Sequence, residues 1–177
     1  VARFEEGKFF EMFASDGPTL LETARALFNA TDKTKAGTAA AITVASLGLA
    51  RADMMKKTTK DGHKLSIAPS ILLVSPDKLT EAEQIVTALT PAQSDKVNPF
   101  SGKLRVVSTA QINGNAWYLF ADPALLPVFE YGLLEGYTAP RMRTDEPFGV
   151  QGIGVSVEHD FGCGAIDFRG AYKNAGA

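Results

Sequence analysis

The sequence predicts an α+β fold, and two features carry that prediction. A short apolar run at residues 71–74 has the composition of a buried strand, and it leads almost directly into an amphipathic helix. Strand-like segments then recur between residues 103 and 174. We expect the strand–helix unit at 64–89 to form the centre of the fold.

The composition is that of an ordinary globular protein. The 177 residues are 45% hydrophobic and 21% charged, and the formal net charge is −2. No basic patch stands out beyond Lys56-Lys57, which argues against direct nucleic-acid readout. A single cysteine excludes an internal disulfide and fits a reducing compartment. No apolar run approaches the ~20 residues of a membrane span, and no secretory leader is evident.

The N-terminal segment predicts an amphipathic helix over residues 1–14. Phe4, Phe9, Phe10 and Phe13 give it an aromatic load that is unusual for a true chain start. Because the chain also begins at Val1, we expect a processed chain or a fragment, in which this helix is the end of a longer one. A turn at 15–18, an apolar segment at 19–28 and an exposed loop at 29–41 follow.

The next helix is expected over residues 43–60, with Thr43 as its cap. Lysines in the last turns would complement the helix dipole, and a turn at 61–62 ends the helix. These lysines are Lys56, Lys57 and Lys60. Its predicted buried face consists of Val44, Leu47, Leu49, Ala50 and Met54.

The central unit contains its own start signal. Pro69 indicates a bend or a sheet edge early in the strand. Ser75 can cap a helix that starts at Pro76, where the missing N–H is not needed, and Asp77 complements the dipole. The helix's apolar stripe is Leu79, Ala82, Ile85, Val86 and Leu89.

The second half of the chain predicts extended structure. A long loop at 90–102 leads to strands at 103–108 and 115–121, joined by a turn at Asn113-Gly114 as in a hairpin. We expect a further strand at 126–135, an extended crossing at 136–149, an alternating strand at 149–160, and a final strand pair or hook at 161–174.

Candidate catalytic residues are few. His159, Asp160 and Cys163 form the one group that resembles a thiol–histidine site. However, adjacent strand residues point to opposite faces, so His159 and Asp160 cannot easily act together. A strand end followed by a turn explains them better. His63 lies in a predicted turn and should be solvated.

Other chemistries are also weakly supported. The scattered histidines and cysteine lack metal-site spacing, and the glycines at 149–154 precede no helix that could bind a dinucleotide. The helix start at Ser75 could bind an anion, but capping alone explains it. Glu81 and Glu83 fit a solvated helical face. We therefore expect no catalytic residue, no cofactor-binding residue, no metal ligand and no enzymatic activity.

Several long stretches resemble one known family. They are RALFNA (25–30), AAAITVASLGLARADMMKK (39–57), IAPSILLVSPDKLTEAEQIVTALTP (67–91), VNPFSGKLRVV (97–107), AWYLFADPA (116–124), FEYGLLEG (129–136) and FGVQGIGVSVEHDFGCGAIDFRGAYKN (148–174). Together they resemble the major head (capsid) subunit of Mu-like bacteriophages and prophages, the gpT-like group. In many of these phages the region is the C-terminal part of a prohead protease–major capsid protein fusion.

The resemblance implies the Hong Kong 97 type capsid fold, truncated so that the N-terminal arm and the extended loop are absent. Residues 1–62 and 137–177 would belong to the peripheral domain and residues 63–136 to the axial domain. The implied function is a structural subunit that self-assembles into the icosahedral shell around phage DNA. It would be located in the virion capsid, and in the bacterial host cytoplasm during assembly.

The implied partners are other copies of the chain in capsomer rings and the shell, a scaffold or prohead protease module upstream, and double-stranded DNA bound only non-specifically. No membrane partner is implied. We expect axial contacts from loop 90–102 and charged contacts between neighbours from segment 136–149, through Arg141, Arg143, Asp145 and Glu146. Two alternatives remain: an encapsulin-like compartment shell, and a small α+β ligand-binding or enzyme domain that uses Ser75 or the His159–Cys163 segment.

Overall fold

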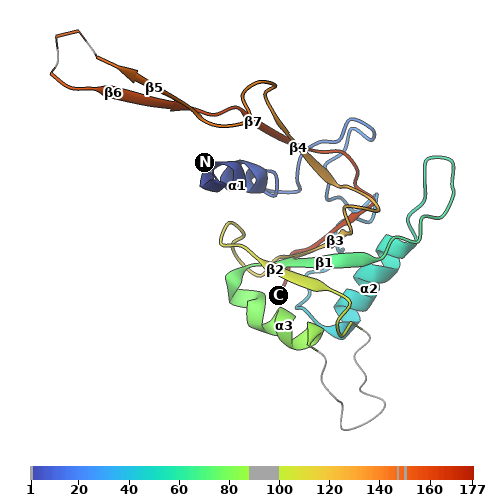
Figure 1. Ribbon diagram of the computed structural model, residues 1–177. Helices are drawn as coiled ribbons and strands as arrows, with labels where there is room; N and C mark the ends of the chain where they lie inside the picture. The colour runs from blue at the N-terminus through green and yellow to red at the C-terminus, as the bar shows by residue number, and fades with distance from the viewer. Residues whose placement is uncertain (1, 88–99, 147, 150) are drawn as a thin grey trace.

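The computed structural model describes residues 2–87, 100–146, 148–149 and 151–177. It confirms the α+β class (Figure 1). The described helices are α1 (Ala2–Glu11), α2 (Val44–Met55) and α3 (Leu79–Val86), and a 3-10 turn, Pro76–Lys78, precedes α3. The described strands are β1 (Pro69–Val74), β2 (Arg105–Ser108), β3 (Trp117–Ala121), β4 (Phe129–Leu133), β5 (Arg141–Asp145), β6 (Gly154–Glu158), β7 (Phe161–Ala165) and β8 (Ala171–Asn174).

A four-stranded sheet in the order β2-β1-β3-β8 forms the centre. Strand β1 pairs with β2 in parallel and with β3 antiparallel, and β3 pairs antiparallel with β8. The pairing of β1 with β3 shifts register between Pro69 and Ile71, which confirms the bend expected at Pro69. The expected hairpin between the strands at 103–108 and 115–121 is wrong. The more apolar β1 lies between them, where both of its faces can be buried.

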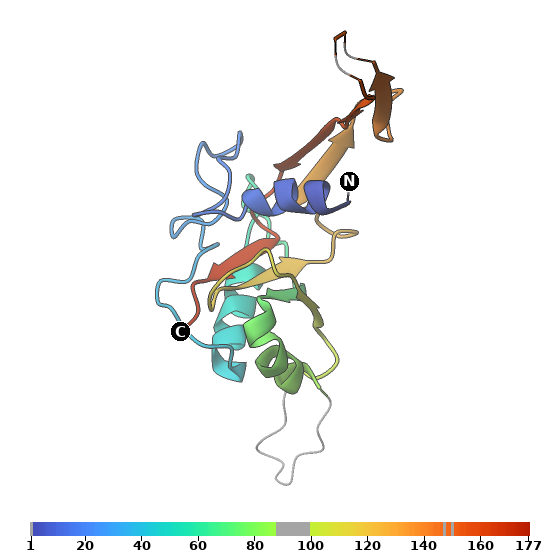
Figure 2. The same ribbon diagram turned by 90° about the vertical axis from the view of Figure 1, so that its left-hand side faces the viewer.

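Alternate side chains of the sheet supply two hydrophobic clusters, one on each face. Leu72 of β1 and Leu119 of β3 pack against α2 and α3 together with Trp117, whose indole N–H donates to the Ala40 carbonyl at 2.9 Å. On the opposite face, Leu73 and Phe120 pack toward α1 and the segment that follows it. Figures 1 and 2 both show α2 and α3 on one side of the sheet and α1 on the other.

The helix starts are only partly as expected. Thr43 caps α2 as predicted, and Thr43 and Ser46 form a reciprocal capping box. Leu47, Ala50 and Met54 are buried as predicted.

Three predictions for α2 are wrong. The helix ends at Met55 rather than residue 60, so its lysines do not occupy a last turn. Val44 and Leu49 are exposed rather than buried.

The central helix also differs at its start. Ser75 makes no side-chain cap; its hydroxyl donates instead to the Gly114 carbonyl at 2.8 Å and holds the turn before β3. Pro76 is the first residue of the 3-10 turn. Ala82 of α3 is buried against the sheet, as predicted. Leu89 lies outside the described residues.

The segment at 29–41 is less exposed than expected. Thr34 is fully buried, and its hydroxyl donates to the Leu27 carbonyl at 2.8 Å. Backbone hydrogen bonds of 2.8 Å join Lys173 of β8 to Thr34 and to Ala36. The segment therefore lies alongside β8.

Two separate strand pairs extend from the body. Strands β4 and β7 pair antiparallel, and so do β5 and β6. The expected strand at 126–135 is thus confirmed as β4. The expected crossing at 136–149 instead contains a paired strand, β5, and the two strands of 161–174 belong to different sheets. Strand β8 lies in the stretch expected for the peripheral domain, yet it completes the sheet of the expected axial domain.

Lys57 is a buried basic residue whose titration makes the stability of the fold depend on pH. Its side chain is buried, and its ammonium group donates to the Asp32 carbonyl. Burial lowers the pKa of Lys57 to about 8, although the charge of Asp32 acts in the opposite direction. Because the unfolded chain keeps this proton up to its ordinary pKa near 10.5, the free energy of unfolding should rise as pH increases from 8 toward 10.

We expect Lys57→Met to unfold at a higher urea concentration than the wild type at pH 7. Between pH 8 and 10, its free energy of unfolding should rise less than that of the wild type. Lys56→Met is the matched control, because Lys56 is exposed. Urea denaturation at several pH values measures both the stability at pH 7 and its change with pH. An equal slope in the wild type and Lys57→Met would contradict the account.

Candidate functional site

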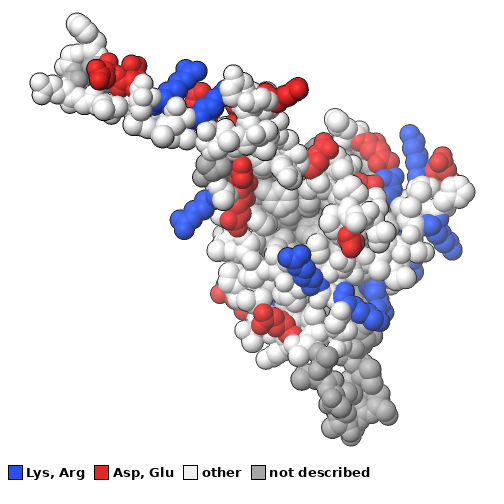
Figure 3. Space-filling view, viewed as in Figure 1, with Lys and Arg blue, Asp and Glu red and all other residues white. Residues whose placement is uncertain are grey.

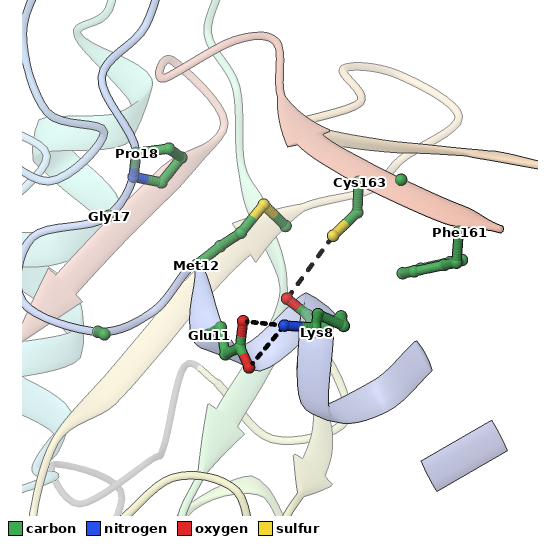
Figure 4. Close-up of a pocket in the computed structure, with 9 residues that line it drawn as sticks. Lys8, Glu11, Met12, Gly17, Pro18, Phe161 and Cys163 are labelled. Carbon is green, nitrogen blue, oxygen red and sulfur yellow. Dashed lines mark hydrogen bonds and ion pairs between the residues drawn. The ribbon is translucent and has the colours of Figure 1, made fainter. Parts of the chain in front are cut away.

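The structure does not assemble the residues of the candidate thiol–histidine group into one site. His159 Nε2 lies 2.6 Å from Glu5 Oε1 of α1, whereas Asp160 binds Arg141 at 2.7 Å. Cys163 lies on β7, and its thiol points to the Lys8 carbonyl of α1 at 3.7 Å (Figure 4). His159 and Asp160 are therefore bonded to different partners, on α1 and on β5.

The surroundings of Cys163 do not favour a nucleophile. Burial raises the pKa of the thiol, and the nearby Glu11 carboxylate raises it further. The neighbouring hollow has a volume of about 500 Å³ and lies between α1, the segment after it and β7 (Figure 4). Its charged groups, Lys8 and Glu11, are paired with each other at 3.0 Å. The hydrogen bond of the thiol goes to a backbone carbonyl, which cannot accept its proton as a base.

The remaining sequence candidates also carry little chemistry. His63 is exposed, as expected for a solvated turn. Glu81 pairs with Lys78 at 3.1 Å on an exposed helical face, and Glu83 is exposed. Most of the expected axial loop, 90–102, lies outside the described residues.

Within the described part of the chain, no group of three or more His, Cys, Asp or Glu could hold a metal ion. No described helix has both the length and the apolar character needed to cross a membrane.

The most distinctive surface is the hairpin formed by β5 and β6. It projects away from the body in both views (Figures 1 and 2). Every residue of β6 is exposed. The space-filling view shows basic and acidic side chains beside one another along this projection (Figure 3).

The two faces of the hairpin differ in character, because directly paired residues of antiparallel strands share a face. Met142 pairs with Val157, and Thr144 with Val155. We call Met142, Val155 and Val157 the apolar face of the hairpin; their exposed fractions are 72%, 59% and 61%. The opposite face is polar and carries the pairs Arg141–Glu158, Arg143–Ser156 and Asp145–Gly154.

A polar cluster fixes the base of the hairpin. Arg141 binds Asp160 at 2.7 Å and Glu158 at 3.6 Å, and its guanidinium lies 4.0 Å from the centre of the Tyr137 ring. Next to this cluster, the hydrogen bond between His159 and Glu5 ties the end of the hairpin to α1. The direction of the hairpin is therefore set by contacts within the chain.

The sequence indicated this region only in part. The alternation of Val155 and Val157 predicted a strand, but the same alternation is typical of strands that are half-buried in a core. The dense charge at 141–146 was the available signal for exposure. Three of the four residues predicted to make charged contacts lie on β5; they are Arg141, Arg143 and Asp145. Arg141 is bound within the chain, whereas Arg143 is exposed.

Comparison with known proteins identifies a family. A family model described as phage capsid protein matches residues 1–174. A search of curated proteins found no significant match.

The polar cluster generates a prediction about hairpin motion. Arg141→Gln removes both ion pairs, so amide hydrogen exchange at 154–162 should become several-fold faster. A loss of about 1 kcal/mol is expected for such partly exposed pairs. Arg143→Gln is the matched control, on the same strand and face. Exchange measured by mass spectrometry tests this, and equal acceleration in both variants would show that Arg141 has no special role.

Proposed function

This chain belongs to the phage capsid protein family, and from that premise we propose that it is a major head subunit that self-assembles into the icosahedral shell around phage DNA. The family describes structural proteins. The absence of an assembled catalytic group among the described residues is consistent with a structural role. The finer assignment proposed here is a Mu-like, gpT-like subunit with the Hong Kong 97 type fold.

The hairpin is the observation that carries this proposal. An isolated two-stranded ribbon is at best marginally stable in water, and three or more strands or a packing partner are normally needed. The apolar face of this hairpin has no such cover among the described residues. A neighbouring subunit would supply it, and a contact between unlike surfaces, repeated from copy to copy, closes into a ring when the rotation between copies closes.

The domain division remains part of the proposal. The central sheet with α3 would face a symmetry axis, and α1 with the two strand pairs would form the periphery. Residues 1–62 and 137–177 were assigned to the periphery, but the pairing of β8 with β3 supports moving residues 171–174 to the axial part. A prohead protease or scaffold module upstream would complete the polypeptide.

The proposed location is the virion capsid, reached after assembly in the host cytoplasm. Contact with packaged DNA is proposed to be non-specific; the net charge of −2 argues neither for nor against a polyanion partner. An encapsulin-like compartment would use the same shell contacts around a protein cargo. Nucleic acid rather than protein inside purified particles would support the phage assignment.

Charge on the apolar face should block assembly. A carboxylate buried there without a partner would cost on the order of several kcal/mol per contact. We expect Val157→Asp to give monomers or small oligomers in a sedimentation gradient and by negative-stain microscopy. Because Val157 is exposed in the isolated chain, the melting temperature should change little.

Ser156→Asp is the control, because it places the same charge on the next residue but on the opposite face. It should assemble. Normal particles from Val157→Asp would remove the apolar face from the assembly contact.

The charged face should affect the rate of assembly. We expect Arg143→Glu to slow particle formation at low salt and to approach wild-type rates at high salt, because exposed charges steer association and are screened. Light scattering over time measures this. Arg141 is unsuitable for the test because it binds Asp160 in its own chain. A rate defect that is independent of salt would contradict a steering role.

A further inference from the structure

The turn that precedes β3 contains an asparagine followed directly by a glycine, Asn113-Gly114. Both residues are exposed, and Gly114 has a φ of 83°, in the left-handed region that glycine favours. Within the described part of the chain, the Asn113 side chain and the Gly114 N–H make no hydrogen bond. The Gly114 nitrogen is therefore free to react with the side-chain carbonyl of the residue before it.

Two other turns have a similar sequence but a different hydrogen-bond pattern. They contain Asp16-Gly17 and Asp61-Gly62, and both glycines also have a positive φ. The Gly17 N–H donates to the Ala14 carbonyl at 3.2 Å, and the Gly62 N–H donates to the Thr59 carbonyl at 3.0 Å. Positive φ thus does not by itself leave a glycine N–H without an acceptor. The turn before β3 differs from these two turns in that respect.

We propose that Asn113 is a site of spontaneous deamidation in the folded chain. The Gly114 nitrogen gives its proton to a solvent base and attacks Cγ of Asn113, so that a C–N bond forms and ammonia leaves. The product is a five-membered succinimide, which water then opens. Cleavage of the bond between Cγ and nitrogen gives aspartate, and cleavage of the bond between the backbone carbonyl carbon and nitrogen gives isoaspartate. The net reaction consumes water, releases ammonia and involves no oxidation or reduction.

The other described asparagines lack this combination of features. Asn29 Nδ2 donates to the Asp32 carboxylate at 2.8 Å, and Asn174 is buried. Asn115 is exposed, but it is followed by Ala116, whose Cβ hinders the approach of its nitrogen to the side-chain carbonyl. Asn115 is therefore a control that lies in the same turn as Asn113.

The reaction would disturb the turn that fixes the start of β3. The buried Ser75 hydroxyl donates to the Gly114 carbonyl at 2.8 Å. Both products place a negative charge at position 113, and isoaspartate also adds a methylene group to the backbone. A displaced Gly114 carbonyl would leave the Ser75 hydroxyl buried without its partner, which is destabilising. Aged molecules should therefore be less stable than newly made ones.

Mass spectrometry of the folded chain tests the site. The protein is held in mildly alkaline buffer at physiological temperature, samples are digested with trypsin, and the peptide 106–141 is compared with a sample taken at the start. We expect Asn113 to deamidate at least ~10-fold faster than Asn115, because the following glycine has no Cβ. The products should elute as two peptides of equal mass, one with aspartate and one with isoaspartate.

Urea denaturation of the aged protein tests the consequence. Its midpoint should fall, whereas that of Asn113→Gln should stay constant over the same period, because the longer side chain does not form the five-membered ring. An equal fall in the wild type and Asn113→Gln would contradict the inferred effect on Ser75.

Two results would overturn the site itself. One is equal rates at Asn113 and Asn115. The other is a rate at Asn113 in the folded chain more than ~100-fold below that in the isolated peptide 106–141, which would mean that the fold protects the turn.

Discussion

Strand β3 is the element on which the rest of the described structure depends. Trp117 and Leu119 point into the hydrophobic cluster between the sheet and α2 and α3. Tyr118 and Phe120 point into the cluster on the opposite face, between the sheet and α1. One strand thereby anchors both faces of the sheet, and β8 and β1 pair along its two edges. Helices and loops of the same chain thus pack against both faces of the sheet and bury most of its apolar side chains. The molecule can then extend strands that have little cover of their own.

The strand pairs β4–β7 and β5–β6 are covered far less than the central sheet. This difference leaves a small subunit with surface that it can offer to its neighbours. Strands β4 and β7 pack against α1 through Phe129 of β4, whose ring centre lies 5.1 Å from that of Phe9. The hairpin beyond them has only the polar cluster at its base. A rigid body with a directed, uncovered apolar face presents the same contact in every copy, and repeated contacts are what a closed shell needs.

Local chemistry made much of this fold predictable. The apolar run at 71–74 identified β1, and Thr43 identified the start of α2, because strand burial and capping depend on neighbours in sequence. Sheet order was not predictable, since placing β1 between β2 and β3 is decided by burial of the whole sheet. Ser75 looked like a cap, yet its hydroxyl bonds to Gly114, 39 residues away. The hairpin was missed because alternation does not reveal what covers a face.

Amide hydrogen exchange in intact particles tests most directly whether neighbouring subunits cover the hairpin. Exchange at 141–145 and 154–158 is compared between particles and dissociated subunits. We predict strong protection of both strands on assembly. If the hairpin exchanges as rapidly in the particle as in the free subunit, it is not the contact that builds the shell.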